Sequence, residues 1–427
     1  MARLVMVGVS HHAAPLEVRE RLAVDEAAWR ASAPTGFSTV LLSTCNRIEV
    51  YAWVDAHPAR AIRSLQRCLA RAAGIELALV QPYLTASTGR DALVHLVRVT
   101  SGLDSLVVGE EQIRGQVREA LRAAESVGPL PAALRGIFQR AGESARRIRG
   151  GTRLGKVPSI ASAGVSVARR SLPESLDGQV ALVLGAGVMA RAAIESLLPA
   201  GARIRIKLLN RTPAHAERLK SQFGSAIEVD SLDALAGALA EAALVVGATA
   251  SRQPVVDLEM LERAVANRAG RPPLVLLDIA LPRDVEPRAR ELDGVKLIDL
   301  DDLERLCPVD AVTRHAERAQ AEALAIDEAD RLAEWLRCRA VSPAIAELRT
   351  YAETIRKSEL RRSAARLRDL TPEQIAAVDA LTAGIVNKLM HGPTVALRDA
   401  AAANPGGLGR SRSRILRVLR PTRGRTA

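Results

Sequence analysis

The sequence predicts a multidomain α/β protein: an α+β domain over residues 1–155, a doubly wound domain over 156–305, and an all-helical domain over 306–427 that begins with a long helix. In the middle part, short apolar runs alternate with helical patterns, which is the order of βαβ units in a parallel sheet. From Ala311 to Arg339 neither glycine nor proline occurs, which predicts one helix of roughly 40 Å at 1.5 Å per residue. The first part mixes strand-like and helical segments without either regularity.

The individual elements follow from the spacing of apolar residues. In the first part we expect strands at 4–9, 40–42 and 48–54, with helices at 17–22, 59–73, 91–100, 110–124 and 130–149. The second part supplies strands at 180–184, 204–209, 244–247, 274–277 and 295–298, and a helix at 190–198 that Gly201 ends. In the third part Pro343 interrupts the long helix, and helical segments follow at 344–367 and 372–390. An all-helical module with an apolar stripe is typical of an oligomerisation domain.

Composition narrows the class of protein. No run of eighteen apolar residues occurs and Met1 leads directly into a strand-like run, so we expect neither a membrane span nor a secretory leader. Four cysteines in 427 residues do not make a disulfide framework, which favours a reducing cytoplasm. More than half of the net charge of +12 comes from a tail, Gly407 to Ala427, with seven arginines and no acidic residue. That charge is compatible with a polyanionic partner, whereas aromatic residues, at 2%, are too few for a base-stacking surface.

A glycine-rich turn follows the apolar run at 180–184 and opens the next helix. Gly185 permits a tight turn, Gly187 lets the backbone approach a pyrophosphate, and Ala190 replaces a third glycine where helix and strand pack. The pyrophosphate would lie at the helix N-terminus. Strand, turn and helix together indicate a Rossmann-like dinucleotide site rather than a plain turn. The cofactor-binding candidates here are Gly185, Ala186, Gly187, Val188, Met189 and Ala190.

The second strand of this unit indicates which dinucleotide is bound. It ends in Asn210, Arg211 and Thr212, where an NAD enzyme normally places an acidic residue for the ribose 2′-hydroxyl. An amide, a guanidinium and a hydroxyl suit a 2′-phosphate instead. The sequence therefore favours NADPH, with an arginine that merely begins the next helix as the alternative.

Cys45 is the candidate nucleophile. It lies in a polar loop between two apolar runs, whereas Cys68 and Cys338 lie in helical patterns and Cys307 precedes a proline. A thiolate attacks an ester well, and the resulting thioester is more easily reduced by hydride than the ester. Reactivity requires a lowered thiol pKa, and Arg47 is the expected nearby cation.

A second polar region lies between residues 95 and 116. His95 sits inside a helical pattern, where a structural histidine is the alternative to a functional one. The stretches 101–105 and 109–116 are dense in small donors and acceptors, which suits recognition of an amino-acid head group.

These motifs together resemble the glutamyl-tRNA reductase family over nearly the whole chain. The matching stretches are 8–12 with Pro15, 43–49, 101–105 running into 109–113, 210–212, 278–284, and 387–391 before Pro393. Residues 159–164 and the arginine-rich tail depart from the family pattern.

The resemblance implies NADPH-dependent reduction of L-glutamyl-tRNA(Glu) to glutamate-1-semialdehyde through a cysteine thioester, the first step of tetrapyrrole (haem) biosynthesis by the five-carbon route. It implies catalytic roles for Cys45 and His95, and no metal. It also implies a homodimer and a transient complex with glutamate-1-semialdehyde aminotransferase. The substrate-binding positions carried over are Thr44, Asn46, Arg47, Ser105, Glu110, Glu111, Gln112 and Gln116.

Two other hypotheses remain open at this point. Another NADPH-dependent semialdehyde- or shikimate-type dehydrogenase would account for residues 175–305, but not for the thiol loop or the helical third part. A nucleotide-binding RNA-interaction protein without catalysis would account for the net charge. Dependence of activity on aminoacylated tRNA separates the first from the reductase, whereas the second predicts no NADPH consumption and no effect from losing Cys45.

Overall fold

The structure is a computed structural model that describes residues 3–55, 57–152, 159–173, 175–198, 203–268, 270–306 and 313–403. Cys307, Gly201 and the tail from Gly407 lie outside these ranges. The chain divides into two compact units, Met1–Ala329 and Asp330–Ala427. The first contains an antiparallel and a parallel sheet and the second is helical, which confirms the predicted multidomain α/β class. Of the described helices, none combines the length and apolarity needed to cross a bilayer.

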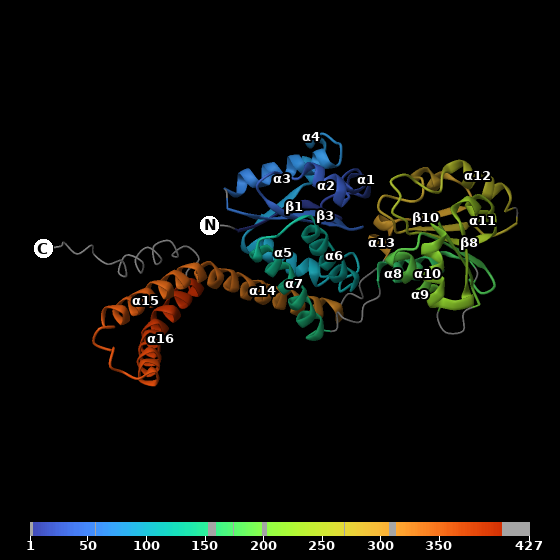
Figure 1. Ribbon diagram of the computed structural model, residues 1–427. Helices are drawn as coiled ribbons and strands as arrows, with labels where there is room; N and C mark the ends of the chain where they lie inside the picture. Colours follow the sequence, from blue (N-terminus) through green and yellow to red (C-terminus); the bar gives the residue numbers. More distant parts are fainter. Residues whose placement is uncertain are drawn as a thin grey trace. The chain divides into compact units, whose positions relative to one another are not determined.

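The N-terminal sheet has four antiparallel strands in the order β2-β3-β1-β4. The strands are β1 (Arg3–Ser10), β2 (Ser38–Ser43), β3 (Arg47–Val54) and β4 (Thr85–Thr88). The helices of this part are α1 (Leu16–Arg21), α2 (Glu26–Ser32), α3 (Pro58–Ala72), α4 (Leu77–Val80), α5 (Arg90–Thr100), α6 (Gln112–Val127) and α7 (Ala132–Gly150). Helix α3 covers one face of the sheet, and α5 and α7 lie on the other (Figure 1). Strand β4 was not predicted, because its four residues are small and give no apolar run.

Strand β3 serves both faces of this sheet because its side chains alternate. Ile48 and Val50 belong to the apolar core that α3 closes with Leu65. Glu49 and Tyr51 point to the opposite face, where they meet side chains of α5 and α7. Glu49 Oε1 lies 2.9 Å from Nε2 of His95 on α5. The Tyr51 ring packs edge-on against the Phe138 ring of α7, with 5.4 Å between the ring centres. The alternation thus places charged side chains inside the protein, opposite an ordinary apolar core.

The second sheet has six parallel strands in the order β10-β9-β8-β5-β6-β7. The strands are β5 (Val180–Leu184), β6 (Arg205–Asn210), β7 (Ile227–Ser231), β8 (Ala242–Gly247), β9 (Leu274–Asp278) and β10 (Val295–Ile298). The direction of winding reverses between β5 and β8, and dinucleotides bind beside such a switch point. Edge strand β7 was not predicted, since its alternating charged residues give no buried run.

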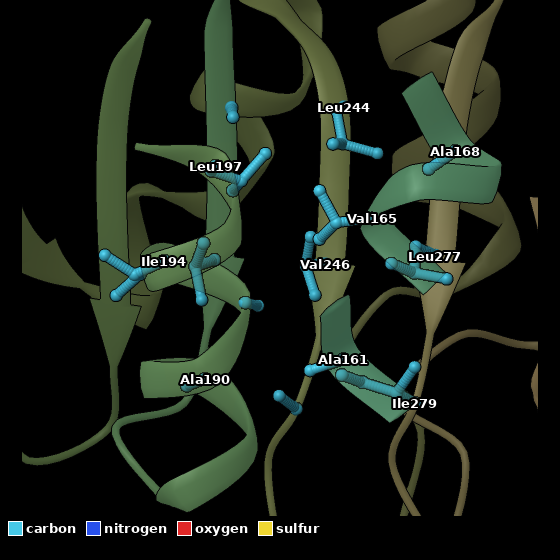
Figure 2. Packing of buried hydrophobic residues seen from close by; sticks show 14 of the residues in the cluster. Ala161, Val165, Ala168, Ala190, Ile194, Leu197, Leu244, Val246, Leu277 and Ile279 are labelled. Carbon is cyan, nitrogen blue, oxygen red and sulfur yellow. The ribbon is translucent and has the colours of Figure 1, made fainter. Parts of the chain in front are cut away.

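Helices cover both faces of the parallel sheet. On one face, Val165 of α8 and Ile194 of α9 pack against Val246 and Leu277 of the central strands (Figure 2). On the other, Leu239 and Leu261 pack on the same strands. The helices are α8 (Ile160–Ser171), α9 (Val188–Leu197), α10 (Pro213–Phe223), α11 (Leu235–Glu241), α12 (Leu258–Ala266) and α13 (Leu300–Leu306).

The long predicted helix is α14 (Thr313–Ala340), with 28 residues. Within the first unit its Glu328 accepts hydrogen bonds from Ser144 at 2.7 Å and from Arg147 at 2.5 Å, both on α7. Its Glu322 pairs with Arg98 of α5 at 3.1 Å. These contacts hold the middle of α14 against the N-terminal part.

The second unit contains α15 (Ser342–Arg362) and α16 (Pro372–Ala403). The break predicted at Pro343 is confirmed, because that residue opens α15. Helix α16 runs past the predicted end at 390 and through Pro393. A proline inside a helix costs about 3 kcal/mol. Burial of Leu397 and Ala401 against α15 offsets that cost and explains the longer helix.

Candidate active site

Cys45 lies in the tight turn that joins β2 to β3. The Thr44 hydroxyl accepts the backbone N–H groups of Asn46 and Arg47, each at 3.3 Å, and the Thr44 N–H donates to the Arg47 carbonyl at 2.8 Å. The Asn46 carbonyl accepts the N–H of His11 at 2.9 Å. A side chain that bonds the backbone two and three residues ahead fixes a turn locally. The turn therefore presents the free Cys45 thiol from a rigid frame.

The expected net lowering of the thiol pKa does not occur in this structure, because burial outweighs the lowering effect of Arg47. Burial raises the pKa of Cys45 to about 12, and the negative charge of Glu110 adds to the rise, while Arg19 and Arg47 act in the opposite direction. The positive charge of Arg47 acts only weakly on the thiol because Glu49 neutralises it: Arg47 Nη1 lies 3.1 Å from Glu49 Oε1. A thiol in this state needs a proton acceptor before it can attack.

Glu49 is the centre of a buried polar network that includes His95. His95 Nε2 lies 2.9 Å from Glu49 Oε1, and the Tyr51 hydroxyl donates to Glu49 Oε2 at 2.6 Å. The Arg47 Nη2 donates to the Asp104 carbonyl, and His95 Nδ1 lies 3.7 Å from the Asp104 carboxylate. Burial alone would raise the pKa of Glu49, but His95, Arg47 and the Tyr51 hydrogen bond more than offset it and lower the pKa to about 2. An ionised Glu49 thus orients the imidazole of His95.

Sequence reasoning did not assign Glu49, Tyr51 or Asp104 to the site. The available signal was a polar residue at every second position of a strand, Arg47, Glu49 and Tyr51, between apolar residues that form a core. Such alternation normally indicates a solvated face. Here α5 and α7 cover that face, and the polar residues are buried.

The predicted substrate-binding residues fall into two groups. Thr44, Asn46, Arg47, Ser105 and Glu110 are buried. The second group, which consists of Glu111, Gln112 and Gln116, lines a cavity of about 600 Å³ between α6 and α7. Val188, at the start of α9, also borders this cavity.

Several buried polar atoms of these residues have no hydrogen-bond partner within the described chain. They are Asn46 Oδ1 and Arg47 Nε, on the two residues that follow Cys45 in sequence, and Gln112 Oε1. Unpaired buried polar atoms are rare in folded proteins and are costly. A ligand with both donors and acceptors would satisfy them, as an amino-acid head group would.

Glu110 is the second carboxylate of interest. It is buried, and burial raises its pKa to about 7, while a hydrogen bond from the Ile160 backbone and the charges of Arg47 and Arg149 act in the opposite direction. A carboxylate with this pKa exchanges protons readily near neutral pH.

His11, His12 and Glu304 form the group whose geometry comes nearest to a metal site in the described part of the chain, with ligand atoms within 4.8 Å of one another. Burial and the positive charges of His12, Arg47 and Arg19 lower the pKa of His11 to about 3. The same positive surroundings oppose binding of a metal cation.

The glycine-rich turn has the shape of a nucleotide cradle. Gly185 has φ +99° and a Cβ there would lie 2.5 Å from the Ala248 carbonyl, so only glycine fits. A Cβ on Gly187 would meet no atom within 4 Å, and no side chain caps the helix that follows it. The free N–H groups at the start of α9 therefore face open space beside the switch point, which suits a pyrophosphate. Ala190 is fully buried, as the packing role requires.

Residues 210–212 lie at the end of β6, next to this cradle. The Asn210 side chain donates to the Thr212 carbonyl at 2.8 Å. Arg211 and Thr212 are exposed, so the guanidinium is accessible to a ligand. The fold and the cradle indicate a nucleotide cofactor.

Comparison with known proteins agrees with this architecture. The family model described as glutamyl-tRNAGlu reductase, N-terminal domain, matches residues 7–152, and the dimerisation domain of the same family matches 320–420. Between them, the model of shikimate / quinate 5-dehydrogenase matches residues 166–306.

Similar whole proteins carry the same name. A glutamyl-tRNA reductase from Synechococcus sp. (strain JA-3-3Ab) is 37% identical over 404 residues, with 92% of each chain covered. One from Moorella thermoacetica is 36% identical over 411 residues, covering 95% of this chain and 92% of the relative. The solved structure of glutamyl-tRNA reductase from Methanopyrus kandleri is 32% identical, covers 97% of this chain and 98% of that one, and has a TM-score of 0.47. The chain therefore belongs to the glutamyl-tRNA reductase family and is an oxidoreductase.

Proposed function

We propose that the protein reduces L-glutamyl-tRNA(Glu) to glutamate-1-semialdehyde with NADPH, as the first step of tetrapyrrole (haem) biosynthesis by the five-carbon route. The observation that carries the proposal is the combination of two sites in one compact unit: a free cysteine in a buried polar turn whose Arg47 pairs with Glu49, the partner of His95, and a nucleotide cradle at a switch point. A shikimate-type dehydrogenase would need the nucleotide cradle but not the cysteine site.

Cys45 attacks the ester carbonyl carbon of the glutamyl group after losing its proton. The carbon–oxygen bond to the tRNA breaks, a carbon–sulfur bond forms, and the tRNA hydroxyl leaves with a proton. We assign proton transfer to His95, which Glu49 orients from 2.9 Å. When bound, NADPH supplies hydride to the thioester carbonyl carbon, which frees the aldehyde and the thiolate.

The glutamyl group is held by the buried polar residues around the turn and by residues of the cavity between α6 and α7. Asn46 Oδ1 and Gln112 Oε1 are acceptors that suit the α-ammonium group, and Arg47 Nε is a donor that suits the carboxylate. We propose this role for the full set: Thr44, Asn46, Arg47, Ser105, Glu110, Glu111, Gln112 and Gln116.

The function is tested by NADPH oxidation in the presence of glutamyl-tRNA(Glu), uncharged tRNA(Glu) and free glutamate. We expect oxidation with the charged tRNA only, because the reaction needs an activated acyl group. Equal oxidation with a small keto acid and no tRNA would instead identify a dehydrogenase of the shikimate type.

We expect Arg211→Ala to raise the KM for NADPH and to leave that for NADH nearly unchanged. Arg211 is exposed at the end of β6, where a 2′-phosphate would lie. A charge-assisted hydrogen bond is worth about 1.5–3 kcal/mol, so the rise is roughly ten- to a hundredfold. Steady-state kinetics with both cofactors measures it, and an equal loss with NADPH and NADH contradicts the assignment.

We further propose a homodimer formed through the helical unit. Along α16, Leu381 is 64% exposed and Leu389 65% exposed, and Ile385 between them is 50% exposed. Positions four residues apart share one face of a helix, so these side chains form one apolar stripe. The dimerisation-domain match at residues 320–420 covers this stripe.

The double substitution Leu381→Glu and Leu389→Glu is expected to give monomers, because it places charges in the centre of the stripe. Light scattering on the full chain measures the mass. Ala376→Glu is the matched control, since residue 376 is exposed on the same helix but lies about 140° around it from Leu381. A dimer that survives the double substitution would place the interface elsewhere.

The aldehyde product is reactive, so we propose that a glutamate-1-semialdehyde aminotransferase receives it in a transient complex in the cytoplasm. Analytical ultracentrifugation of the two purified proteins with substrate present would detect that complex. Sedimentation as two independent species would argue against it.

A further inference from the structure

Arg19 is a fully buried arginine that touches the catalytic turn. It lies on α1 and none of its side chain is accessible to solvent, yet its guanidinium has partners on all sides. Its Nε donates to the Ala14 carbonyl at 3.2 Å, its Nη1 to the Cys45 carbonyl at 2.8 Å, and its Nη2 to Asp301 at 2.5 Å. A buried guanidinium is stable only when its donors are paired in this way.

Asp301 brings the nucleotide-binding part into this contact. It lies on α13, which packs on the parallel sheet through Leu300 and Leu303. The other oxygen of its carboxylate accepts the N–H of Leu16, at the start of α1, at 3.1 Å. Arg19 thus connects the carbonyl of the catalytic cysteine to a helix of the nucleotide-binding part through one side chain.

A second ion pair joins the same parts without touching the turn. Glu20, the next residue of α1, accepts from the Arg283 side chain at 2.6 and 2.8 Å and from the Arg283 N–H at 2.6 Å. Loss of this pair weakens the same docking of α1 but leaves Arg19 on Cys45. The chain therefore offers its own control.

We infer that Arg19 is a positioning residue that couples the conformation of the Cys45 turn to docking of the nucleotide-binding part through Asp301. With Asp301 in place, Arg19 holds the Cys45 carbonyl and fixes the direction of the thiol. Without it, the guanidinium lacks its counter-charge and the turn loosens. Any role of this coupling in hydride transfer depends on the proposed function, whereas the coupling itself follows from the contacts of Arg19 and does not.

The test compares Asp301→Asn with Glu20→Gln in the full-length protein. Alkylation of Cys45 by iodoacetamide is followed on its own peptide by mass spectrometry, which separates it from the other cysteines. We expect about a tenfold faster reaction in Asp301→Asn and less than a twofold change in Glu20→Gln, because only the first releases Arg19. Equal rates in the two variants, or no change in Asp301→Asn, would overturn the inference.

A second pair of variants keeps the test independent of folding defects. Arg19→Lys retains a buried cation near Asp301, and Arg19→Met removes it. We expect the lysine variant to alkylate more nearly like wild type than the methionine variant. In the reductase assay, Asp301→Asn should lower kcat with the KM for NADPH unchanged within twofold. Alkylation needs neither substrate nor cofactor, so it reports on the coupling even if the assay finds no reduction of glutamyl-tRNA.

Discussion

Cys45→Ser is expected to lose both thioester formation and reduction, by about 10⁴-fold or more, as the loss of a catalytic nucleophile does in other enzymes. A serine hydroxyl in this turn is a much poorer nucleophile than a thiol and would face the same burial that raises the pKa of Cys45 to about 12. Release of the labelled glutamyl group from charged tRNA, as glutamate without NADPH and as the semialdehyde with it, measures both steps. Cys338→Ser, at a partly exposed helix position, is the control and should match wild type.

The same assay separates acyl transfer from hydride transfer. Without NADPH, wild-type protein should still form the thioester, and water should then discharge it slowly. Gly187→Val should abolish reduction but spare this esterase activity, because its side chain enters the open space of the cradle and touches nothing near the thiol. If the Gly187 variant also loses thioester formation, or if Cys45→Ser reduces at the wild-type rate, the two-step scheme is wrong.

Glu49→Gln is expected to lower the free energy of unfolding by about 3 kcal/mol at neutral pH and to reduce activity as well. The substitution leaves the buried Arg47 with only the Asp104 carboxylate, 3.7 Å away, as a counter-charge and removes the carboxylate that orients His95. Breaking one side of a buried ion pair typically costs about 3–5 kcal/mol. Urea unfolding measures the loss, and the assay with charged tRNA measures the fall in kcat.

The stabilising effect of Glu49 should depend on pH in a stated direction. The folded pKa of Glu49 is lowered to about 2 from an ordinary value of 4.5, so its contribution is present above pH 4.5 and is lost as the pH falls toward 2. The gap in unfolding free energy between wild type and Glu49→Gln should therefore narrow below pH 4.5. A gap that stays constant down to pH 3 would show that Glu49 does not act as an ionised group.

Part of this protein can be predicted from the sequence because the determinants are local. The nucleotide turn is one: a strand, two glycines and a helix occupy consecutive residues, and the structure places them as expected. The turn around Cys45 is another. The polar network is different, because Glu49 and His95 are 46 residues apart and a single sequence contains no record that they meet. The thiol pKa also escaped prediction, since it depends on burial and on Glu110, a residue remote in sequence.

The double use of β3 has a consequence for folding. A shift of one residue in the pairing of β3 with β1 would turn Arg47, Glu49 and Tyr51 into the apolar core and bring Ile48 and Val50 to the face of His95. Such a chain would bury unpaired charges, and the cost in free energy would prevent it from packing. Correct strand pairing and assembly of the catalytic network are therefore one event, and an out-of-register chain cannot persist as a folded but inactive protein.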